Sequence, residues 1–139
     1  MAYSIRAIPG TSYHYVRLFD DWGMSDAAAV FGELAARNLC LAGHQLIFDV
    51  RDGKVQMSLA DSMSLVDVFR SHAVVFTGMR LAVLVPDVFQ YGLACSCGLM
   101  AGAVQFDFYV TLSPEIACTW AGIPINALAE WHASSLAAA

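Results

Sequence analysis

Hydrophobic and polar residues follow one another along the chain with periods that predict strands and helices in turn. The run RLAVLVP at 80–86 is continuously apolar, which is typical of a parallel strand covered on both faces. Pro9-Gly10 suits a tight turn, and Asp52-Gly53 is expected to end a strand in the same way. The segments whose composition predicts strands are 3–8, 12–19, 45–50, 80–86 and 105–110.

Apolar residues at helical spacing predict helices between these strands. Each predicted helix begins at a residue type that caps helix N-termini, namely Ser25, Ser58, Asp87 and Ser113. The second helix is expected to bury the face formed by Leu59, Met63, Val66, Phe69 and Ala73. The predicted helices cover about 25–38, 58–76, 87–102 and 114–121.

The resulting order is β-β-α-β-α-β-α-β-α, which predicts an α/β fold. A hairpin leads into strand-helix-strand units with right-handed crossovers, so we expect a mixed sheet with helices mainly on one face. Residues 1–124 are interpreted as a single domain. Residues 125–139 form a C-terminal extension, either a short helix packed through Ile125, Leu128 and Trp131 or a disordered tail.

The chain is unusually apolar, with 58% hydrophobic and 14% charged residues. Average soluble domains have roughly 45–50% and about 25%. One compact core cannot bury this excess, so the composition predicts a second buried surface. That surface is a dimer interface, a pocket for an apolar or lipid-like ligand, or a contact with a membrane surface. We expect a homodimer or a larger assembly.

Charge and cysteine content exclude several classes of protein. The net charge is −5 and the seven basic residues are scattered, so we expect no nucleic-acid partner. Residues 88–106 carry no charge, but their glycines, glutamines and acidic flanks argue against a transmembrane span. The amino terminus has no apolar run typical of a signal peptide, and the four cysteines read as reduced thiols. The expected location is therefore cytoplasmic.

The cysteines do not predict a metal site. Cys95 and Cys97 are two positions apart on a predicted helix and would not face each other. Cys40 and Cys118 are isolated, so we interpret all four as small core residues. No cofactor or nucleophile motif is present, and we expect neither a metal nor a cofactor.

The strongest candidate for a ligand site is the carboxyl edge of the strands at 45–50 and 80–86, where α/β folds bind ligands. Two predicted helix N-termini point there, which would suit the acidic head of an amphiphile held with Arg51. The residues of this predicted crevice are Asp49, Arg51, Ser58, Asp87, Phe89 and Tyr91.

Each of these residues also has a simpler interpretation. Asp87 is a good helix cap, and Ser58 with Asp61 resembles a capping box, although a serine at a helix start is also a candidate phosphoacceptor. Phe89 and Tyr91 either line a pocket or pack on the sheet. Acid-base catalysis by the carboxylates of this crevice is the least favoured alternative.

The segments QLIFDVRDG, LAVLVPDVFQYGLA and FDFYVTLSPEIACTWAGIP together resemble the bacterial SpoIIAA-like proteins. These are small relatives of the sulphate-transporter and anti-sigma-factor-antagonist (STAS) domain, with a likeness to lipid-binding CRAL-TRIO (Sec14-type) domains. The resemblance covers about residues 3–124. It implies a four- to five-stranded mixed sheet, non-enzymatic behaviour and frequent dimers. The phosphoacceptor serine of anti-sigma antagonists would fall at Ser58, but the surrounding motif is absent.

Two functions are therefore expected. The favoured one is a non-catalytic, STAS-like regulatory module that binds another protein or itself. The alternative is a carrier or sensor of a small apolar or lipid-like ligand, acting in solution or at a membrane surface.

Overall fold

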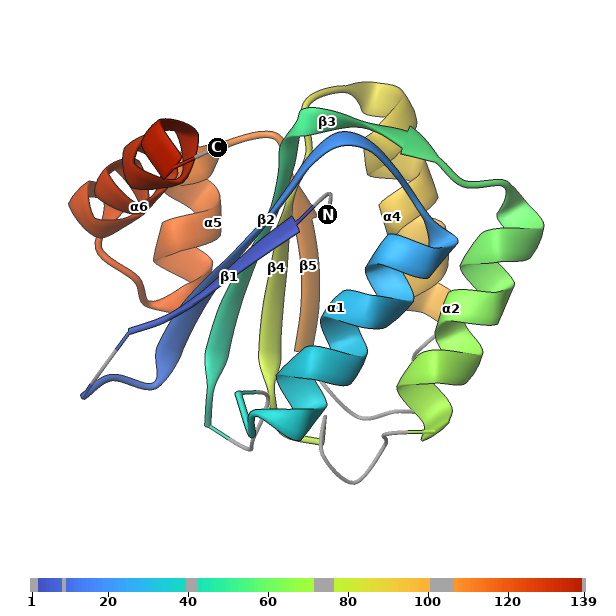
Figure 1. The fold of residues 1–139 in the computed structure, drawn as a ribbon, viewed down its shortest axis with the longest axis horizontal. Helices are drawn as coiled ribbons and strands as arrows, with labels where there is room; N and C mark the ends of the chain where they lie inside the picture. The colour runs from blue at the N-terminus through green and yellow to red at the C-terminus, as the bar shows by residue number, and fades with distance from the viewer. Residues whose placement is uncertain (1–2, 9, 40–42, 72–76, 101–106, 139) are drawn as a thin grey trace.

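A computed structural model describes residues 3–8, 10–39, 43–71, 77–100 and 107–138 of the chain. A five-stranded sheet in the order β1-β2-β3-β4-β5 forms its centre (Figure 1). Strand β1 is antiparallel to β2, and every later neighbour is parallel. The predicted mixed α/β fold, with a hairpin followed by parallel strand-helix-strand units, is confirmed.

The strands are β1 Tyr3–Ala7, β2 Tyr13–Gly23, β3 Gln45–Gln56, β4 Arg80–Leu84 and β5 Asp107–Thr111. The helices are α1 Met24–Ala36, α2 Leu59–Ser71, α4 Val88–Met100, α5 Pro114–Ala121 and α6 Ile125–Ala138. Parts of the segments predicted to be regular, at 72–76 and 101–106, lie outside the described residues.

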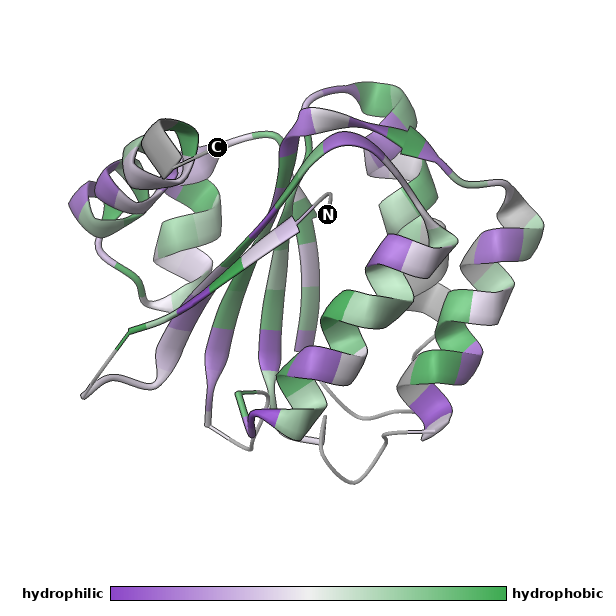
Figure 2. Ribbon diagram, in the orientation of Figure 1, coloured by the Kyte–Doolittle hydropathy of each residue, from purple (hydrophilic) through white to green (hydrophobic). Residues whose placement is uncertain are grey.

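Helices cover both faces of the sheet. Helices α1, α2 and α4 lie on one face, and α5 and α6 lie on the other (Figure 1). The middle of the central strands is hydrophobic and their amino-terminal ends are hydrophilic (Figure 2). Because side chains alternate along a strand, the core divides into two clusters. Buried members of the first include Val16, Leu46, Phe48, Leu81 and Val83, and those of the second include Tyr15, Ile47, Ala82, Leu84 and Trp131.

The helix boundaries follow local capping chemistry. Ser113 accepts a hydrogen bond from the Ile116 amide, and Gly122 ends α5 with φ at 75°, as the sequence predicts. The N-cap of α1 is Gly23 and not the predicted Ser25, which lies inside the helix, and the carboxylate of Asp26 accepts from the Gly23 backbone amide at 3.0 Å. In α2 the buried side chains include Leu65 and Val66, whereas Met63 is 57% exposed. The predicted burial of Val66 is confirmed, and the predicted burial of Met63 is wrong.

Strand β3 does not turn at Asp52-Gly53, and that prediction is wrong. The strand continues to Gln56, paired with the second half of β2 through Asp20↔Gly53 and Trp22↔Val55. A register shift between Arg17 and Phe19 accommodates one extra residue of β3. Both strands bend over the layer of α1, α2 and α4 (Figure 1). This pairing, which is remote in sequence, overrides the local turn preference of Asp-Gly.

None of the helices within the described ranges combines the length and hydropathy that crossing a lipid bilayer requires.

Replacing Gly53 by alanine should destabilise the protein. A Cβ at residue 53 would lie 2.7 Å from the backbone oxygen of Asp20 and 2.7 Å from Cδ1 of Trp22. We expect Gly53→Ala to lower the free energy of unfolding by about 1–3 kcal/mol. Gly32→Ala is the matched control, since a Cβ there meets no atom within 4 Å. That change, inside helix α1, should stabilise by about 0.5–1 kcal/mol. Urea unfolding measures both, and an unchanged midpoint for Gly53→Ala would contradict the strand pairing described above.

Candidate functional site

The six residues of the predicted crevice do not lie in one place. Asp49 and Arg51 follow Ile47 on β3 at alternate positions, so they face the layer of α5 and α6. Ser58 and Asp87 stand at the starts of α2 and α4, in the opposite layer. The sheet thus separates Arg51 from the helix N-termini with which it was expected to hold an acidic head group.

Asp49 is completely buried, and hydrogen bonds within the protein use both of its oxygens. Tyr15 donates its hydroxyl to Oδ2 at 2.7 Å. Arg51 donates Nε to Oδ1 at 2.9 Å, Nη2 to Oδ2 at 2.8 Å, and its backbone amide to Oδ1 at 3.1 Å. This bidentate ion pair between the Arg51 guanidinium and the Asp49 carboxylate compensates the cost of burying the carboxylate. The arrangement holds β2 and β3 together.

Asp52 links the sheet to the terminal helix. Its Oδ2 accepts from Nε of Arg17 at 2.9 Å and lies 2.6 Å from Nε2 of His132 on α6. Arg17 is almost fully buried. We call the six side chains on this face the charged network; they are Tyr15, Arg17, Asp49, Arg51, Asp52 and His132.

The pKa shifts in the charged network favour its present ionisation. Burial, followed by the charge of Asp49, raises the pKa of Tyr15 well above its ordinary value, so its hydroxyl remains a donor. The hydrogen bond to Asp49 raises the pKa of Arg51. Burial works to raise the pKa of Asp52, but hydrogen bonds from Arg17 and His132 outweigh burial and lower it. These shifts favour a neutral Tyr15 hydroxyl, a charged Arg51 guanidinium and an ionised Asp52 carboxylate.

Ser58 and Asp87 both serve as helix caps. The Asp61 amide donates to the Ser58 hydroxyl oxygen at 3.1 Å, and the Ser58 amide donates to the Asp61 carboxylate at 2.9 Å. This is the predicted capping box with aspartate as the acidic member. The Asp87 carboxylate accepts a hydrogen bond from the backbone amide of Gln90 at 2.8 Å. A phosphoacceptor role for Ser58 remains a prediction.

Phe89 and Tyr91 point away from the protein interior. Phe89 is 72% exposed and Tyr91 is 40% exposed. The face of α4 that turns inward carries Gln90, Leu93 and Ala94, at positions i, i+3 and i+4. The two aromatic residues therefore do not pack on the sheet, and a contact of theirs with a ligand remains a prediction.

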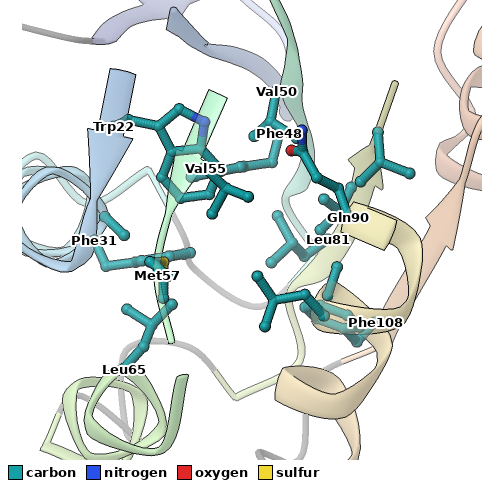
Figure 3. Close-up of a pocket in the computed structure, with 15 residues that line it drawn as sticks. Trp22, Phe31, Phe48, Val50, Val55, Met57, Leu65, Leu81, Gln90 and Phe108 are labelled. Carbon is teal, nitrogen blue, oxygen red and sulfur yellow. The ribbon is translucent and has the colours of Figure 1, made fainter. Parts of the chain in front are cut away.

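A cavity lies between the sheet and the layer of α1, α2 and α4, and we call it the internal cavity (Figure 3). Its volume is about 70 Å³. The long ends of β2 and β3 contribute Trp22 and Val55 to its wall, and α4 contributes Gln90. The lining residues are Trp22, Ala27, Phe31, Phe48, Val50, Val55, Met57, Leu65, Leu81, Val83, Val85, Gln90, Leu93, Ala94 and Phe108.

Sequence reasoning did not find the internal cavity. One signal was present, because Gln90 is a polar residue at helical spacing with Leu93 and Ala94. The contribution of Trp22 could not be read from the sequence, since it depends on the unpredicted extension of β2 along β3.

Neither Cys95 nor Cys118 lines the internal cavity. Cys118 is buried on α5, and burial raises the pKa of its thiol. Cys95 is partly buried, while Cys40 and the side chain of Cys97 lie outside the described part of the chain. Within the described residues, no three histidine, cysteine, aspartate or glutamate side chains are grouped so that they could hold a metal ion.

Comparisons with known proteins bear on the fold. No protein-family model matches the sequence, and no curated protein matches it significantly. Among solved structures, the chain is similar to an uncharacterised protein of the DUF3478 family from Shewanella loihica PV-4, which has a SpoIIAA-like fold. The alignment has a TM-score of 0.57 and 13% identity, and it covers 86% of this chain and 92% of the other.

The chain has a SpoIIAA-like fold. The five-stranded mixed sheet and the order of its strands agree with that assignment, so the resemblance seen in the sequence is confirmed for the fold. At 13% identity the likeness extends to the fold alone. The function of this SpoIIAA-like fold must therefore be argued from its own residues.

Removing the charge of Asp52 should destabilise the protein in a pH-dependent way. We expect Asp52→Asn to cost about 1–3 kcal/mol at pH 7, because it weakens the bonds to Arg17 and His132. The folded-state pKa of Asp52 lies below its ordinary value of 3.8. Its stabilisation is thus present above pH 3.8 and is lost as the pH falls through the lower folded-state value. Urea unfolding at neutral and strongly acidic pH should show the cost shrinking in acid.

The matched control is Asp67→Asn, which removes an exposed carboxylate 3.6 Å from Arg70. That variant should lose less than about 0.5 kcal/mol. Equal losses in the two variants, or a loss for Asp52→Asn that does not change with pH, would refute the role given to the charged network.

Proposed function

We propose that the protein is a non-catalytic binding module whose internal cavity takes a small apolar ligand. The observation that carries this proposal is the lining of the cavity, in which thirteen of the fifteen side chains are hydrocarbon or thioether groups and none is charged. Cavities lined mainly by apolar side chains bind apolar molecules. The absence of an ionisable group from the lining also supports binding without acid-base chemistry.

The free-energy cost of an unfilled cavity supports a binding role for the internal cavity. Protein interiors are normally packed with few voids. Leaving 70 Å³ of this space unfilled costs at most about 2 kcal/mol, the usual penalty for an enclosed cavity of that volume. A ligand that fills the space recovers this free energy, so binding and stability are coupled.

The volume limits the ligand. A cavity of about 150 Å³ accommodates benzene, and the internal cavity is smaller at 70 Å³. Without movement of the helices it accepts a hydrocarbon segment smaller than benzene, and a chain of five or six carbon atoms enters only if α4 moves away from the sheet. Burial of five methylene groups contributes about 4 kcal/mol, which corresponds to a Kd of about 1 mM. A longer lipid-like chain would need α4 to move away from the sheet.

Filling the internal cavity should abolish ligand binding. We expect n-hexane to shift the methyl resonances of Leu65 and Val83 in the wild-type protein, because both line the cavity. Ala94→Leu should remove this response, since the added carbon atoms occupy the space. Ala129→Leu is the matched control on the exposed surface of α6 and should bind as the wild type does. An unchanged response in Ala94→Leu, or no response in the wild type, would rule out the proposed function.

A second candidate function, binding to a second copy of the chain, is favoured by exposed apolar residues near β5. Strand β5 is an edge of the sheet, and such edges are templates for pairing. Tyr109, Leu112 and Ile116 are each more than one-third exposed on β5 and the adjoining segment. Together with the apolar composition, they support the STAS-like interaction module and its homodimer.

Sedimentation equilibrium tests the dimer. We expect a species of twice the 15.0 kDa chain mass at micromolar concentration. Ile116→Asp should shift it to the monomer, because a charge opposes burial in an apolar interface. Met63→Asp places the same charge on α2, where the methionine is exposed, and should leave the dimer intact. A wild-type monomer would remove this second candidate.

A further inference from the structure

Two polar atoms face the internal cavity without a hydrogen-bond partner. They are the indole nitrogen Nε1 of Trp22 and the amide oxygen Oε1 of Gln90. Both side chains are only 8% exposed, and neither atom has a partner among the described residues. In Figure 3 both polar ends lie toward Val50, above the hydrocarbon groups of Met57 and Leu65.

Burying polar atoms without hydrogen-bond partners lowers the free energy of unfolding. The great majority of buried polar side-chain atoms are hydrogen-bonded, and each exception in a native structure requires an explanation. Phenylalanine at 22 or methionine at 90 would fill similar space without the penalty of an unpaired buried group. The sequence instead places one donor and one acceptor in a wall that otherwise consists of apolar side chains.

Backbone contacts position both residues. A Cβ at Gly53 would lie 3.1 Å from Nε1 of Trp22, so the indole lies directly against that glycine. Gln90 is the third residue of α4, and its backbone amide donates to the side-chain carboxylate of Asp87 at 2.8 Å. The donor and the acceptor are therefore presented from two separate and defined elements, the end of β2 and the start of α4.

We propose, resting on the function proposed above, that the ligand is an uncharged apolar alcohol. Its hydroxyl oxygen accepts a hydrogen bond from Nε1 of Trp22, and its hydroxyl proton is donated to Oε1 of Gln90. A hydroxyl group both accepts and donates a hydrogen bond, so it offers what each of the two atoms lacks. The hydrocarbon part of the alcohol occupies the apolar remainder of the internal cavity.

The lining argues against a carboxylate head group. None of the fifteen lining residues is basic, so an anion would be buried without a counter-charge. An ionised carboxylate also has no proton to donate to Oε1 of Gln90. This selectivity differs from the acidic head group that the sequence suggested, because Arg51 lies on the other face of the sheet and pairs with Asp49.

The experiment compares 1-hexanol, n-hexane and hexanoate at pH 7 on the wild type and on Gln90→Met. The variant keeps the length of the side chain and removes the acceptor. We expect it to weaken 1-hexanol about tenfold, the loss typical of one buried hydrogen bond, without weakening n-hexane. Hexanoate should show no saturable binding to either protein. The variant without ligand should unfold at a higher temperature, because an unpaired buried oxygen is gone.

A second measurement needs no variant at residue 90. The indole N–H resonance of Trp22, assigned by its absence in Trp22→Phe, should move downfield with 1-hexanol and stay near its place with n-hexane. The two tryptophans outside the cavity lining, Trp120 and Trp131, provide internal controls.

The outcomes separate the two proposals. If n-hexane and 1-hexanol both bind, but Gln90→Met changes them equally and the Trp22 resonance does not distinguish them, the alcohol is refuted and the apolar cavity stands. Preferential binding of hexanoate also refutes the alcohol. If none of the three compounds binds the wild type, the proposed function fails and this inference fails with it.

Discussion

Strand β3 is hydrogen-bonded to two parallel neighbours along its first half and to β2 along its second half. Its side chains alternate between the two helix layers, so Leu46, Phe48 and Val50 face one layer and Ile47 and Asp49 face the other. This alternation makes one strand contribute to both the internal cavity and the charged network. The register shift between Arg17 and Phe19 then returns Asp52 to the face of Asp49, where it meets His132.

The two faces use their polar groups differently. On the side of α5 and α6, the buried carboxylate of Asp49 is bonded through both oxygens, and Asp52 connects β3 to α6. On the side of α1, α2 and α4, the polar atoms of Trp22 and Gln90 have no partner in the described structure. Nη1 of Arg17 in the charged network is also buried without a partner among the described residues, but the rest of that side chain is held by the ion pair with Asp52. The unpaired atoms of Trp22 and Gln90 instead belong to residues that line a cavity, and unpaired buried groups reduce stability. The ligand site is therefore placed in the internal cavity, and the charged network is given a structural role.

Local chemistry was enough to predict much of the fold. The Ser113-Pro114 start and Gly122 end of α5, the capping box of Ser58 with Asp61, and the buried strand β4 all follow from residues close in sequence. The extension of β3 through Asp52-Gly53 did not, because its stability comes from pairing with residues 20–23. The candidate site shared this limit. The predicted crevice was assembled from residues that follow strands in the sequence. In the structure, the alternation of side chains along β3 places Arg51 on the face of α5 and α6, whereas Ser58 and Asp87 lie in the layer of α1, α2 and α4. Trp22 and Gln90 are sixty-eight positions apart and line one cavity only because of the tertiary fold.

The central claim is that the internal cavity is a binding space for apolar molecules. A crystal of the protein pressurised with xenon tests it most directly, because xenon enters dry apolar cavities and is located by its scattering. The account predicts one strong xenon site enclosed by Phe31, Leu81 and Val83, with the side chains of the lining moved little. A cavity filled by ordered water, or collapsed side chains with no xenon between the sheet and α4, would contradict it.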